Sequence, residues 1–418
     1  MAKGKWDRVV LREICDSVKY GYTASAKSEP IGPKFLRITD IMPDQIDWVS
    51  VPYCEIDDDK LNKYLLKEGD IVIARTGTPG YAKRIRADHQ AVFASYLVRI
   101  RVDPKCDSQY VGYVIESAEY KQFVELNRGG AAQPHANAQI LTSFPIPLPP
   151  LPIQHKIAAI LSTYDDLIEN NTRRIKILED MAQTLYREWF VQYRFPGHEN
   201  VPMVQSELGP IPQGWEVKML GEMCNVLMGQ SPKSEFYNKI GEGLPFHQGV
   251  TDFGSRYPTD RVYCTIQKRI AEIDDILFSV RAPVGRINIA NKRIIIGRGL
   301  SAIRSKSNHQ HFIIHQLKDR FQEEDTMGSG TIFNAITKAD LLGIQLLKPI
   351  IHLIAKFEKT VQPISSELAN LTIKNNNLRQ TRDLLLPKLI SGEIDVSQLD
   401  IATDEVQPNQ GGTPIRYS

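Results

Sequence analysis

Two loops in this sequence combine arginine, small hydroxyl side chains and glycine directly after a short β-rich run. The first covers residues 75–81 and reads Arg-Thr-Gly-Thr-Pro-Gly-Tyr, and its counterpart covers residues 279–286. Glycine allows a backbone to approach a ligand closely, while arginine and hydroxyl groups bind phosphates and base edges. A further loop at residues 128–137 adds amide and imidazole groups, and its counterpart precedes Lys338. These loops predict contacts with nucleic acid.

The residues that we expect to contact DNA carry a basic, hydroxyl, amide, imidazole or phenol group in or beside these loops. They are Arg75, Thr76, Thr78, Tyr81, Lys83, Arg84, Gln133, His135, Asn137, Ser279, Arg281, Arg286, Arg298, Asn334 and Lys338. The competing interpretation is that the loops are ordinary hairpin turns whose basic residues keep the surface soluble. The occurrence of the pattern in two places favours the DNA interpretation.

Positive charge is concentrated in this chain rather than abundant. Its 418 residues include 51 Lys and Arg against 49 Asp and Glu, a formal net charge of +2. Between Arg75 and Arg101, however, six basic residues stand against Asp88 alone, and between Arg281 and Lys306 seven basic residues stand against none. The net charge therefore gives no argument for nucleic acid, but the two basic stretches do.

The sequence is a repeat of two halves. Residues 6–15 reappear as residues 215–224, and residues 69–80 reappear as residues 274–285, at offsets of 209 and 205. Further matches follow in the same order, and the offset falls to 200 near the end of each half. A constant order with slowly drifting offsets indicates a duplication with small changes in loop length.

Each half is expected to contain a globular domain followed by a long helix. Residues 1–150 and 205–348 hold short β-rich runs between Gly, Pro, Asn and Asp turns, which predicts a mixed α/β domain with a curved sheet. Residues 151–194 and 349–395 are predicted to be helical, and residues 400–418 to be a disordered tail. The predicted fold class is therefore α+β, a duplicated unit of one mixed domain and one long helix.

Apolar residues in both helical segments recur at alternating steps of three and four, which is typical of a coiled-coil seam. The residues expected to pair the helices are Ile168, Asn171, Ile175, Leu178, Leu185, Leu368, Leu371, Asn375, Leu378 and Leu385. One such stripe would also fit a helix packed on its own domain, but two matched stripes favour helices that pair with each other. The prediction is an antiparallel coiled coil with pseudo-two-fold symmetry, which would hold the domains about 50 Å apart.

Polar residues and prolines interrupt this pattern. Asn171 and Asn375 lie in the seams, where a polar residue fixes the register at a cost in stability. Asn375 and Arg382 weaken the second seam, which suggests that a partner protein covers it. Pro363 is expected in the first turn of its helix, and Pro387 at a kink near the end.

Signatures of several chemistries are missing from the sequence. It has no GxxxxGK[ST] phosphate loop, no Asp-Pro-Pro-Tyr or Asn-Pro-Pro-Tyr tetrapeptide and no HExxH pair. The acidic run 57–59 and the clustered His309, His311 and His315 are expected to face solvent. The five cysteines form no CxxC pair, which fits a reducing cytoplasm. With no long apolar run and no signal-peptide core, we expect no catalytic residue, no metal site and no membrane span.

Four segments carry a resemblance to a known family through their order and duplication. They are residues 69–77, 147–157, 328–337 and 384–394. Through these segments the chain resembles the specificity subunit of Type I restriction-modification systems over nearly its whole length. The pattern departs from the family at residues 131–135 and 348–352, in domains that vary widely among members.

The resemblance implies a non-catalytic subunit that carries no cofactor of its own. Each domain, called a target-recognition domain in this family, would read one half of a bipartite, asymmetric site in double-stranded DNA. The helices would set the spacing between half-sites and dock two modification subunits, which bring S-adenosylmethionine and methylate adenine. Restriction subunits, which use ATP and Mg²⁺, would join this core in the cytoplasm.

Two other interpretations remain open at this point. One is a self-contained DNA-modifying enzyme, a nuclease or a methyltransferase, whose motifs escape recognition; catalysis by the purified chain would reveal it. The other is a coiled-coil scaffold with protein-binding domains and no DNA role. Salt-dependent binding to duplex DNA would exclude the scaffold, because phosphate contacts release counterions.

Overall fold

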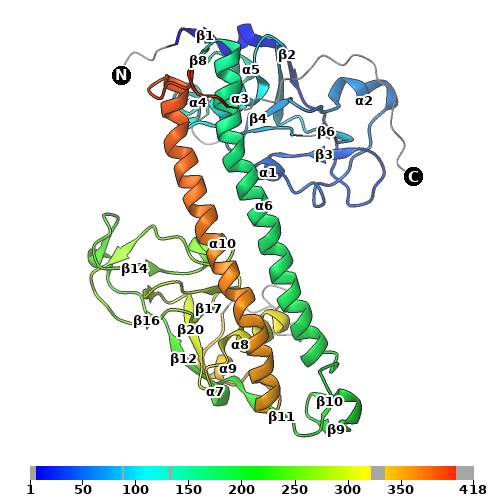
Figure 1. Cartoon of the computed structure of the whole chain (residues 1–418), viewed down its shortest axis with the longest axis vertical. Helices are drawn as coiled ribbons and strands as arrows, with labels where there is room; N and C mark the ends of the chain where they lie inside the picture. Colours follow the sequence, from blue (N-terminus) through cyan, green and yellow to red (C-terminus); the bar gives the residue numbers. More distant parts are fainter. Residues whose placement is uncertain (1–5, 87–88, 131–133, 322–334, 402–418) are drawn as a thin grey trace. The chain divides into compact units, whose positions relative to one another are not determined.

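The computed structural model of the chain describes residues 6–86, 89–130, 134–321 and 335–401 (Figure 1). It forms two compact units, and each contains one globular domain together with parts of both long helices. Unit 1 comprises residues 1–170 and 374–418, and unit 2 comprises residues 171–373. Most of the tail expected at 400–418 lies outside the described residues, which end at residue 401.

A four-stranded antiparallel sheet forms the centre of the domain in unit 1. Its order is β2–β7–β4–β5, with β2 at Cys15–Tyr20, β7 at Leu97–Val102, β4 at Ile71–Ala74 and β5 at Ala82–Arg84. Alternate residues of β4 enter different cores, because Ile71 and Ile73 pack with the helices while Val72 and Ala74 pack with Phe93. Side chains of a strand alternate between faces, so the all-apolar run of β4 fits a strand covered on both sides.

Shorter elements complete this domain. β3 (Lys34–Leu36) pairs in parallel with β6 (Ala91–Phe93), and β1 (Arg8–Val10) pairs with β8 (Pro145–Pro147). The short helices are α1 (Ile38–Ile41), α2 (Asp58–Tyr64), α3 (Ser108–Glu116), α4 (Ala118–Asn127) and α5 (Ala138–Thr142). Asp107 caps α3 by accepting hydrogen bonds from the N–H groups of Gln109 and Tyr110.

Unit 2 repeats this sheet strand for strand, which confirms the duplication. Its order is β12–β20–β17–β18, with β12 at Cys224–Met228, β20 at Leu300–Ser305, β17 at Ile276–Ser279 and β18 at Ile287–Ile289. Ile276 and Phe278 of β17 enter one core and Leu277 enters the other, as the residues of β4 do. The mixed α/β domain predicted for each half is therefore correct.

The remaining elements of unit 2 surround this sheet. A five-stranded sheet contains β13 (Tyr237–Asn238), β15 (Tyr263–Cys264), β14 (Leu244–His247), β19 (Ile294–Ile296) and β16 (Ile270–Ala271). In it β14 and β19 pair in parallel, as β3 and β6 do in unit 1. Two ladders join β9 (Met203–Ser206) to β10 (Gly209–Pro212) and β11 (Glu216–Met219) to β21 (Gln345–Lys348). The short helices are α7 (Leu220–Met223), α8 (Gln310–Arg320) and α9 (Lys338–Leu342).

The two long helices, α6 (Leu151–Phe190) and α10 (Ile351–Ser391), pack together (Figure 1). In unit 1, Ile157 near the start of α6 shares a core with Leu389 near the end of α10. In unit 2, Tyr186 near the end of α6 shares a core with Phe357 near the start of α10. Within each unit the helix segments are therefore antiparallel, as predicted.

The predicted seam residues lie in or near the contact between these helix segments. Those that are buried are Ile168, Leu368, Leu371 and Asn375, and those that are half-buried are Asn171, Ile175, Leu178, Leu185, Leu378 and Leu385. Asn375 is 3% exposed, and its amide donates a hydrogen bond to the carbonyl of Ile168 at 3.3 Å. This bond ties one helix to the other at a single register, which is the usual effect of a polar seam residue.

One expectation for the second helix is wrong. α10 begins at Ile351, so Pro363 lies inside the helix rather than in its first turn. A proline inside a helix removes one backbone hydrogen bond, and the burial of the nearby Val361 in the core of unit 2 holds this turn in place. Pro387 lies near the helix end at Ser391, and the kink expected there stays a prediction. The guanidinium of Arg382 is bound within the chain, by Asp165 of α6 and Asp383 of α10.

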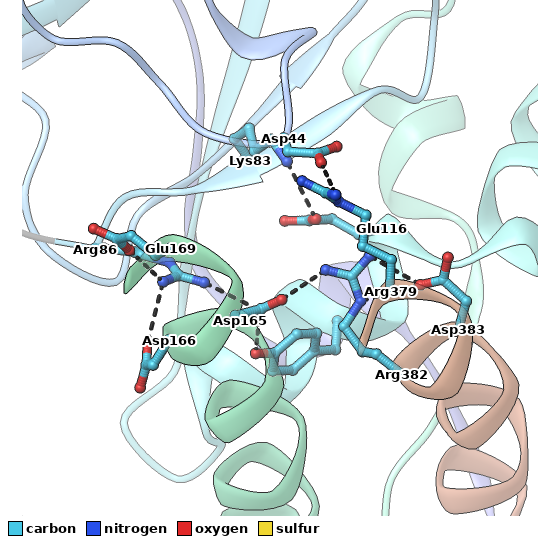
Figure 2. A network of polar contacts seen from close by, with 11 residues as sticks. Asp44, Lys83, Arg86, Glu116, Asp165, Asp166, Glu169, Arg379, Arg382 and Asp383 are labelled. Carbon is cyan, nitrogen blue, oxygen red and sulfur yellow. Dashed lines mark hydrogen bonds and ion pairs between the residues drawn. The ribbon is translucent and has the colours of Figure 1, made fainter. Parts of the chain in front are cut away.

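An ionic junction joins the domain of unit 1 to the helices (Figure 2). Asp165 of α6 accepts hydrogen bonds from Arg382 of α10 at 2.6 Å and from Arg86 at 3.0 Å. The hydroxyl of Tyr113 on α3 donates to the same carboxylate at 2.6 Å, and burial raises the pKa of Tyr113. We call Asp165, Arg382, Arg86 and Tyr113 the Asp165 junction. It fastens α6, α10 and the domain to one another.

Aromatic side chains make the corresponding junction in unit 2. The ring of Phe190 on α6 lies 4.9 Å from that of Phe312 on α8 and 5.2 Å from that of Phe357 on α10. His315 of α8 is 8% exposed, and its Nδ1 lies 2.8 Å from the Gln183 side-chain oxygen. The expectation that the clustered histidines face solvent is therefore wrong for His315, because α6 and α10 cover it.

Candidate functional site

The first predicted loop turns at the end of β4 and leads into β5. Two backbone hydrogen bonds close it, from the Gly80 N–H to the carbonyl of Ala74 at 3.0 Å and from the Tyr81 N–H to the carbonyl of Thr78 at 3.2 Å. Gly80 has a φ of +88°, and a Cβ atom there would lie 3.0 Å from Val124 of α4. The strand end and α4 therefore fix the shape of this loop, and glycine is required where they meet.

The second predicted loop of unit 1 lies directly beside the first. The N–H of Ala136 donates to the carbonyl of Arg75 at 2.8 Å, and Thr76 forms a backbone bridge with His135. His135 also exchanges two backbone hydrogen bonds with Gly129, at 3.0 and 3.1 Å. We call residues 75–81 and 134–137 loop pair 1. The fold brings these two predicted loops together.

Unit 2 contains the same arrangement. The N–H of Ile336 donates to the carbonyl of Val280 at 3.0 Å, and Arg281 forms a backbone bridge with Ala335. By these bonds Val280 occupies the place that Arg75 has in unit 1. We call residues 280–286 and 335–338 loop pair 2. One backbone frame is thus built twice, with different side chains.

Helix caps end both loop pairs in the same way. The side chain of Asn137 accepts a hydrogen bond from the Ile140 N–H at 2.8 Å and caps α5. Thr337 caps α9 by accepting from the Asp340 N–H at 3.2 Å. The amide of Asn137, predicted as a DNA contact, therefore has a structural role as well. Lys338 follows the second cap and is exposed.

Lys83 and Arg84, also predicted as DNA contacts, are engaged with α3 instead. The ammonium of Lys83 faces the carboxylate of Glu116 (Figure 2), at a distance of 3.6 Å. Arg84 donates from Nε to the hydroxyl of Ser108 at 3.3 Å, and burial lowers its pKa. The structure does not bring these two side chains into loop pair 1.

Two other basic residues of the first concentrated stretch are held inside the domain. Arg99 is fully buried, and Arg101 donates to Asp70 at 2.7 Å. Unit 2 repeats the second of these contacts, because Arg304 donates to Asp275 at 2.6 Å. Much of the local positive charge is therefore neutralised by ion pairs that support the sheet.

In loop pair 2 the predicted arginines remain at the surface. Arg281 and Arg286 are exposed, and so is Arg298 on the neighbouring turn. Ser279 is different, because it is 1% exposed and its hydroxyl donates to the carbonyl of Pro283 at 2.7 Å. The same hydroxyl accepts from the Arg286 N–H at 2.8 Å, so Ser279 shapes the loop from inside and is not available for DNA.

The remaining predicted contacts fall into two groups. Thr76 and Thr78 are half-buried in loop pair 1, while Tyr81 and His135 are exposed there. Gln133 and Asn334 lie outside the described residues, as does the segment Gly328–Thr331. The side chains of the described members give loop pair 1 a mixed polar surface.

Sequence reasoning missed Tyr20, which lies at the end of β2. The guanidinium carbon of Arg75 lies 4.8 Å from the centre of the Tyr20 ring. The hydroxyl of Tyr20 accepts a hydrogen bond from the N–H of Ala138 at 2.9 Å. Tyr20 belongs to no motif, and its only signal in the sequence is its place at the end of the first β-rich run.

The described residues offer few groups for metal binding or for nucleophilic catalysis. Among them, no three or more His, Cys, Asp or Glu side chains are grouped to hold a metal ion, and no helix is long and apolar enough to cross a membrane. Burial raises the pKa of Cys15 and Cys54 to about 11 and that of Cys224 to about 12. These thiols are therefore protonated, and poorly nucleophilic, at neutral pH.

Two matched α/β domains, each with a loop pair at the end of its central strand and a share of two packed helices, define a duplicated recognition protein. The family model of the Type I restriction modification DNA specificity domain matches residues 3–180 and 212–361, and the chain belongs to this family. The resemblance drawn from the sequence is thereby confirmed.

Individual relatives agree with this family. The chain is 31% identical over 402 residues to the putative type I restriction enzyme MjaX specificity subunit of Methanocaldococcus jannaschii, with 94% of each chain covered. It is 22% identical to the HindI specificity subunit of Haemophilus influenzae, over 82% of this chain and 91% of the relative. The crystal structure of the Type I S subunit from M. genitalium shares the fold, with a TM-score of 0.56 at 17% identity over 93% of this chain and 97% of that one.

Family membership gives the chain its general role. It is the specificity subunit of a type I restriction-modification complex and recognises DNA target sequences. The specificity subunit is itself non-catalytic and carries no cofactor. The function is thus to select DNA, and the loop pairs are the candidate residues for that selection.

Proposed function

We propose that each domain reads one half of a bipartite, asymmetric site in double-stranded DNA through its loop pair. The observation that carries this proposal is the repeated backbone frame with different side chains. Arg75 and Thr76 of loop pair 1 are matched by Val280 and Arg281 of loop pair 2. Base edges are distinguished by the hydrogen-bonding groups that meet them, so two equal frames with unequal groups should prefer two different sequences.

The long helices are proposed to set the spacing and to dock two modification subunits. In this proposal residues 1–150 and 205–348 are the target-recognition domains, and residues 151–194 and 349–395 are the helical spacers. Large apolar side chains that the described helices leave exposed support a docking role. They include Leu167, Ile177 and Met181 on α6, and Ile373 and Leu384 on α10, at 48 to 69% exposure. Exposed apolar side chains are typical of surfaces that bind other proteins.

The partners supply the chemistry that the chain lacks. Modification subunits would bring S-adenosylmethionine and methylate adenine, and restriction subunits would bring ATP and Mg²⁺. Assembly would take place in the cytoplasm, which suits the five described cysteines, all of them free thiols. Within this division of labour, the chain selects the site and places the partners on it.

Loop pair 2 provides the test. In cells that produce the chain with its modification subunits, Arg281→Ala together with Arg286→Ala should reduce or relax recognition of one half-site. Each lost bidentate base contact costs about 1–3 kcal/mol, whereas a lost phosphate contact mainly reduces the salt dependence of binding. The bases accepted in the other half-site should not change. Methylome sequencing measures both half-sites at once.

The matched control is Arg293→Ala. Arg293 is an exposed arginine of the same domain that lies 3.4 Å from Glu272 and outside loop pair 2. Its replacement should leave both half-sites as they are. Equal loss of specificity at both half-sites in the loop variant would contradict the proposal that each domain reads its own half.

A further inference from the structure

Tyr20 and Arg75 meet because both of their strands pair with β7. Tyr20 ends β2 opposite Val98, and Arg75 follows Ala74, which lies opposite Leu97. The two side chains therefore start from one end of the sheet, and the guanidinium carbon comes to 4.8 Å from the ring centre. An arginine over an aromatic face is attracted by the ring and loses rotational freedom.

The backbone of Arg75 is held on both sides as well. Its N–H donates to the carbonyl of Tyr96 at 3.0 Å, and its carbonyl accepts from the Ala136 N–H at 2.8 Å. The hydroxyl of Tyr20 accepts from the N–H of Ala138 at 2.9 Å. Tyr20 thus contacts Arg75 of loop pair 1 through its ring, and through its hydroxyl it contacts Ala138, the residue that directly follows loop pair 1 and begins α5.

One donor of this arginine, Nε, is not used inside the domain. Within the described part of the chain, Nε of Arg75 is buried and has no hydrogen-bond partner. A buried donor without a partner is costly, so most such groups in proteins are paired. Stacking on Tyr20 thus orients a guanidinium whose Nε has no partner inside the domain, and its planar set of donors is suited to a ligand with two acceptors in one plane.

We infer that Tyr20 is a positioning residue that orients Arg75 to bind a guanine in the half-site read by the first domain. Among the bases, guanine presents two acceptors in the major groove, N7 and O6, at the spacing of the arginine fork. In unit 2 the matched places hold Val280 and Met228, which lies opposite Ser301 at the end of its strand. The inferred guanine therefore belongs to one half-site only. The inference rests on the proposed function.

The test uses the chain assembled with its modification subunits. Methylome sequencing first identifies the half-site read by the first domain, as the one altered in Arg75→Ala. Duplexes are then made in which each guanine of that half-site is replaced in turn by 7-deazaguanine, which lacks the N7 acceptor. At one guanine the wild-type complex should lose affinity by about 5- to 10-fold. The Arg75→Ala complex should show no such loss at that position.

The Tyr20 variants separate positioning from simple packing. Tyr20→Leu removes the ring and should abolish the response to 7-deazaguanine, whereas Tyr20→Phe keeps the ring and should retain it. The matched control is Tyr53→Leu, which removes a second cation–ring pair of the same domain, that of Lys34 with Tyr53 at 4.3 Å. This control should respond to 7-deazaguanine like the wild type. Unchanged methylation of the other half-site shows that each variant is folded.

The possible failures are distinguishable. A Tyr20→Leu complex that responds to 7-deazaguanine like the wild type would overturn the positioning role and leave the proposed function intact. If no guanine of the half-site shows a 7-deazaguanine effect that depends on Arg75, the guanine assignment is overturned and the proposed function again stays intact. If Arg75→Ala altered both half-sites equally, the proposed division between two reading domains would itself be wrong.

Discussion

At the scale of single residues, the fold decides which charges are available to a ligand. Arg101 bonds Asp70, which is 31 residues away in the sequence, and Arg86 bonds Asp165, which is 79 residues away. Neither pair belongs to a local pattern. The basic stretches were visible in the sequence, but their use depends on contacts that only the tertiary structure creates.

The Asp165 junction should be sensitive to loss of its central charge. Asp165→Asn keeps the shape but leaves the guanidinium groups of Arg382 and Arg86 with a weaker partner, and it alters the bond from Tyr113. Because the arginines are partly exposed, we expect a loss of about 1–2 kcal/mol in the free energy of unfolding. Urea unfolding of the purified chain measures it. Asp166→Asn, at an exposed carboxylate that also faces Arg86, is the control and should have little effect.

His315 should make the stability of unit 2 depend on pH. Burial, with smaller contributions from Lys318, His311 and Arg256, lowers its pKa from 6.5 to about 3. The unfolded chain then binds a proton that the folded chain does not, so this contribution is complete above pH 6.5 and is lost as the pH falls toward 3. Between pH 6 and 4, the free energy of unfolding should fall with decreasing pH in both proteins. The fall should be steeper in the wild type than in His315→Gln, by about 1.4 kcal/mol per pH unit. The control is His198→Gln, and parallel curves for His315→Gln and the wild type would contradict the prediction.

At the scale of elements, the seam between the antiparallel helix segments could be predicted from the sequence. Apolar spacing along a helix is a local property of the sequence, and the burial of Leu368 and Leu371 follows from it. The junctions between helices and domains could not be predicted, because they join α3 or α8 to both long helices. The sequence therefore identified the loops that form the loop pairs. It did not identify Tyr20, because β2 lies far from both loops of loop pair 1 in the sequence.

Helix length is expected to set the distance between the half-sites. Four residues inserted after Lys176 in α6, with four after the matched Asn376 in α10, would add about 6 Å and about 400° of rotation to each helix. The seam then nearly returns to register. Since B-DNA rises about 3.4 Å per base pair, the spacer between half-sites should lengthen by about one or two base pairs. Methylome sequencing should show the same two half-sites at the new spacing.

Insertions of two residues at the same places serve as the control. They rotate each helix by about 200°, which turns apolar seam residues away from their partners, so assembly should fail. An active four-residue variant with the original spacer would show that the helices do not measure the gap.

At the scale of the whole molecule, selection of DNA and catalysis lie on different chains. With a net charge of only +2, the isolated chain should bind duplex DNA weakly and gain affinity when modification subunits are added. Incubation with DNA and S-adenosylmethionine should produce no methylated adenine unless those subunits are present. Gel-shift titrations at several salt concentrations and a methylation assay test both statements. Methyl transfer by the chain alone would contradict them.

The difference between the two junctions predicts what a domain taken from a relative must supply in a chimeric chain. A first domain taken from another specificity subunit must supply a cation and a hydroxyl at the places of Arg86 and Tyr113, or Asp165 loses two of its partners. A second domain must supply aromatic rings that fit Phe190 and Phe357. Each half of the chain therefore carries its own compatibility requirement. If each domain reads one half-site, as proposed, a chimera that meets this requirement should acquire a new half-site without a new pair of helices.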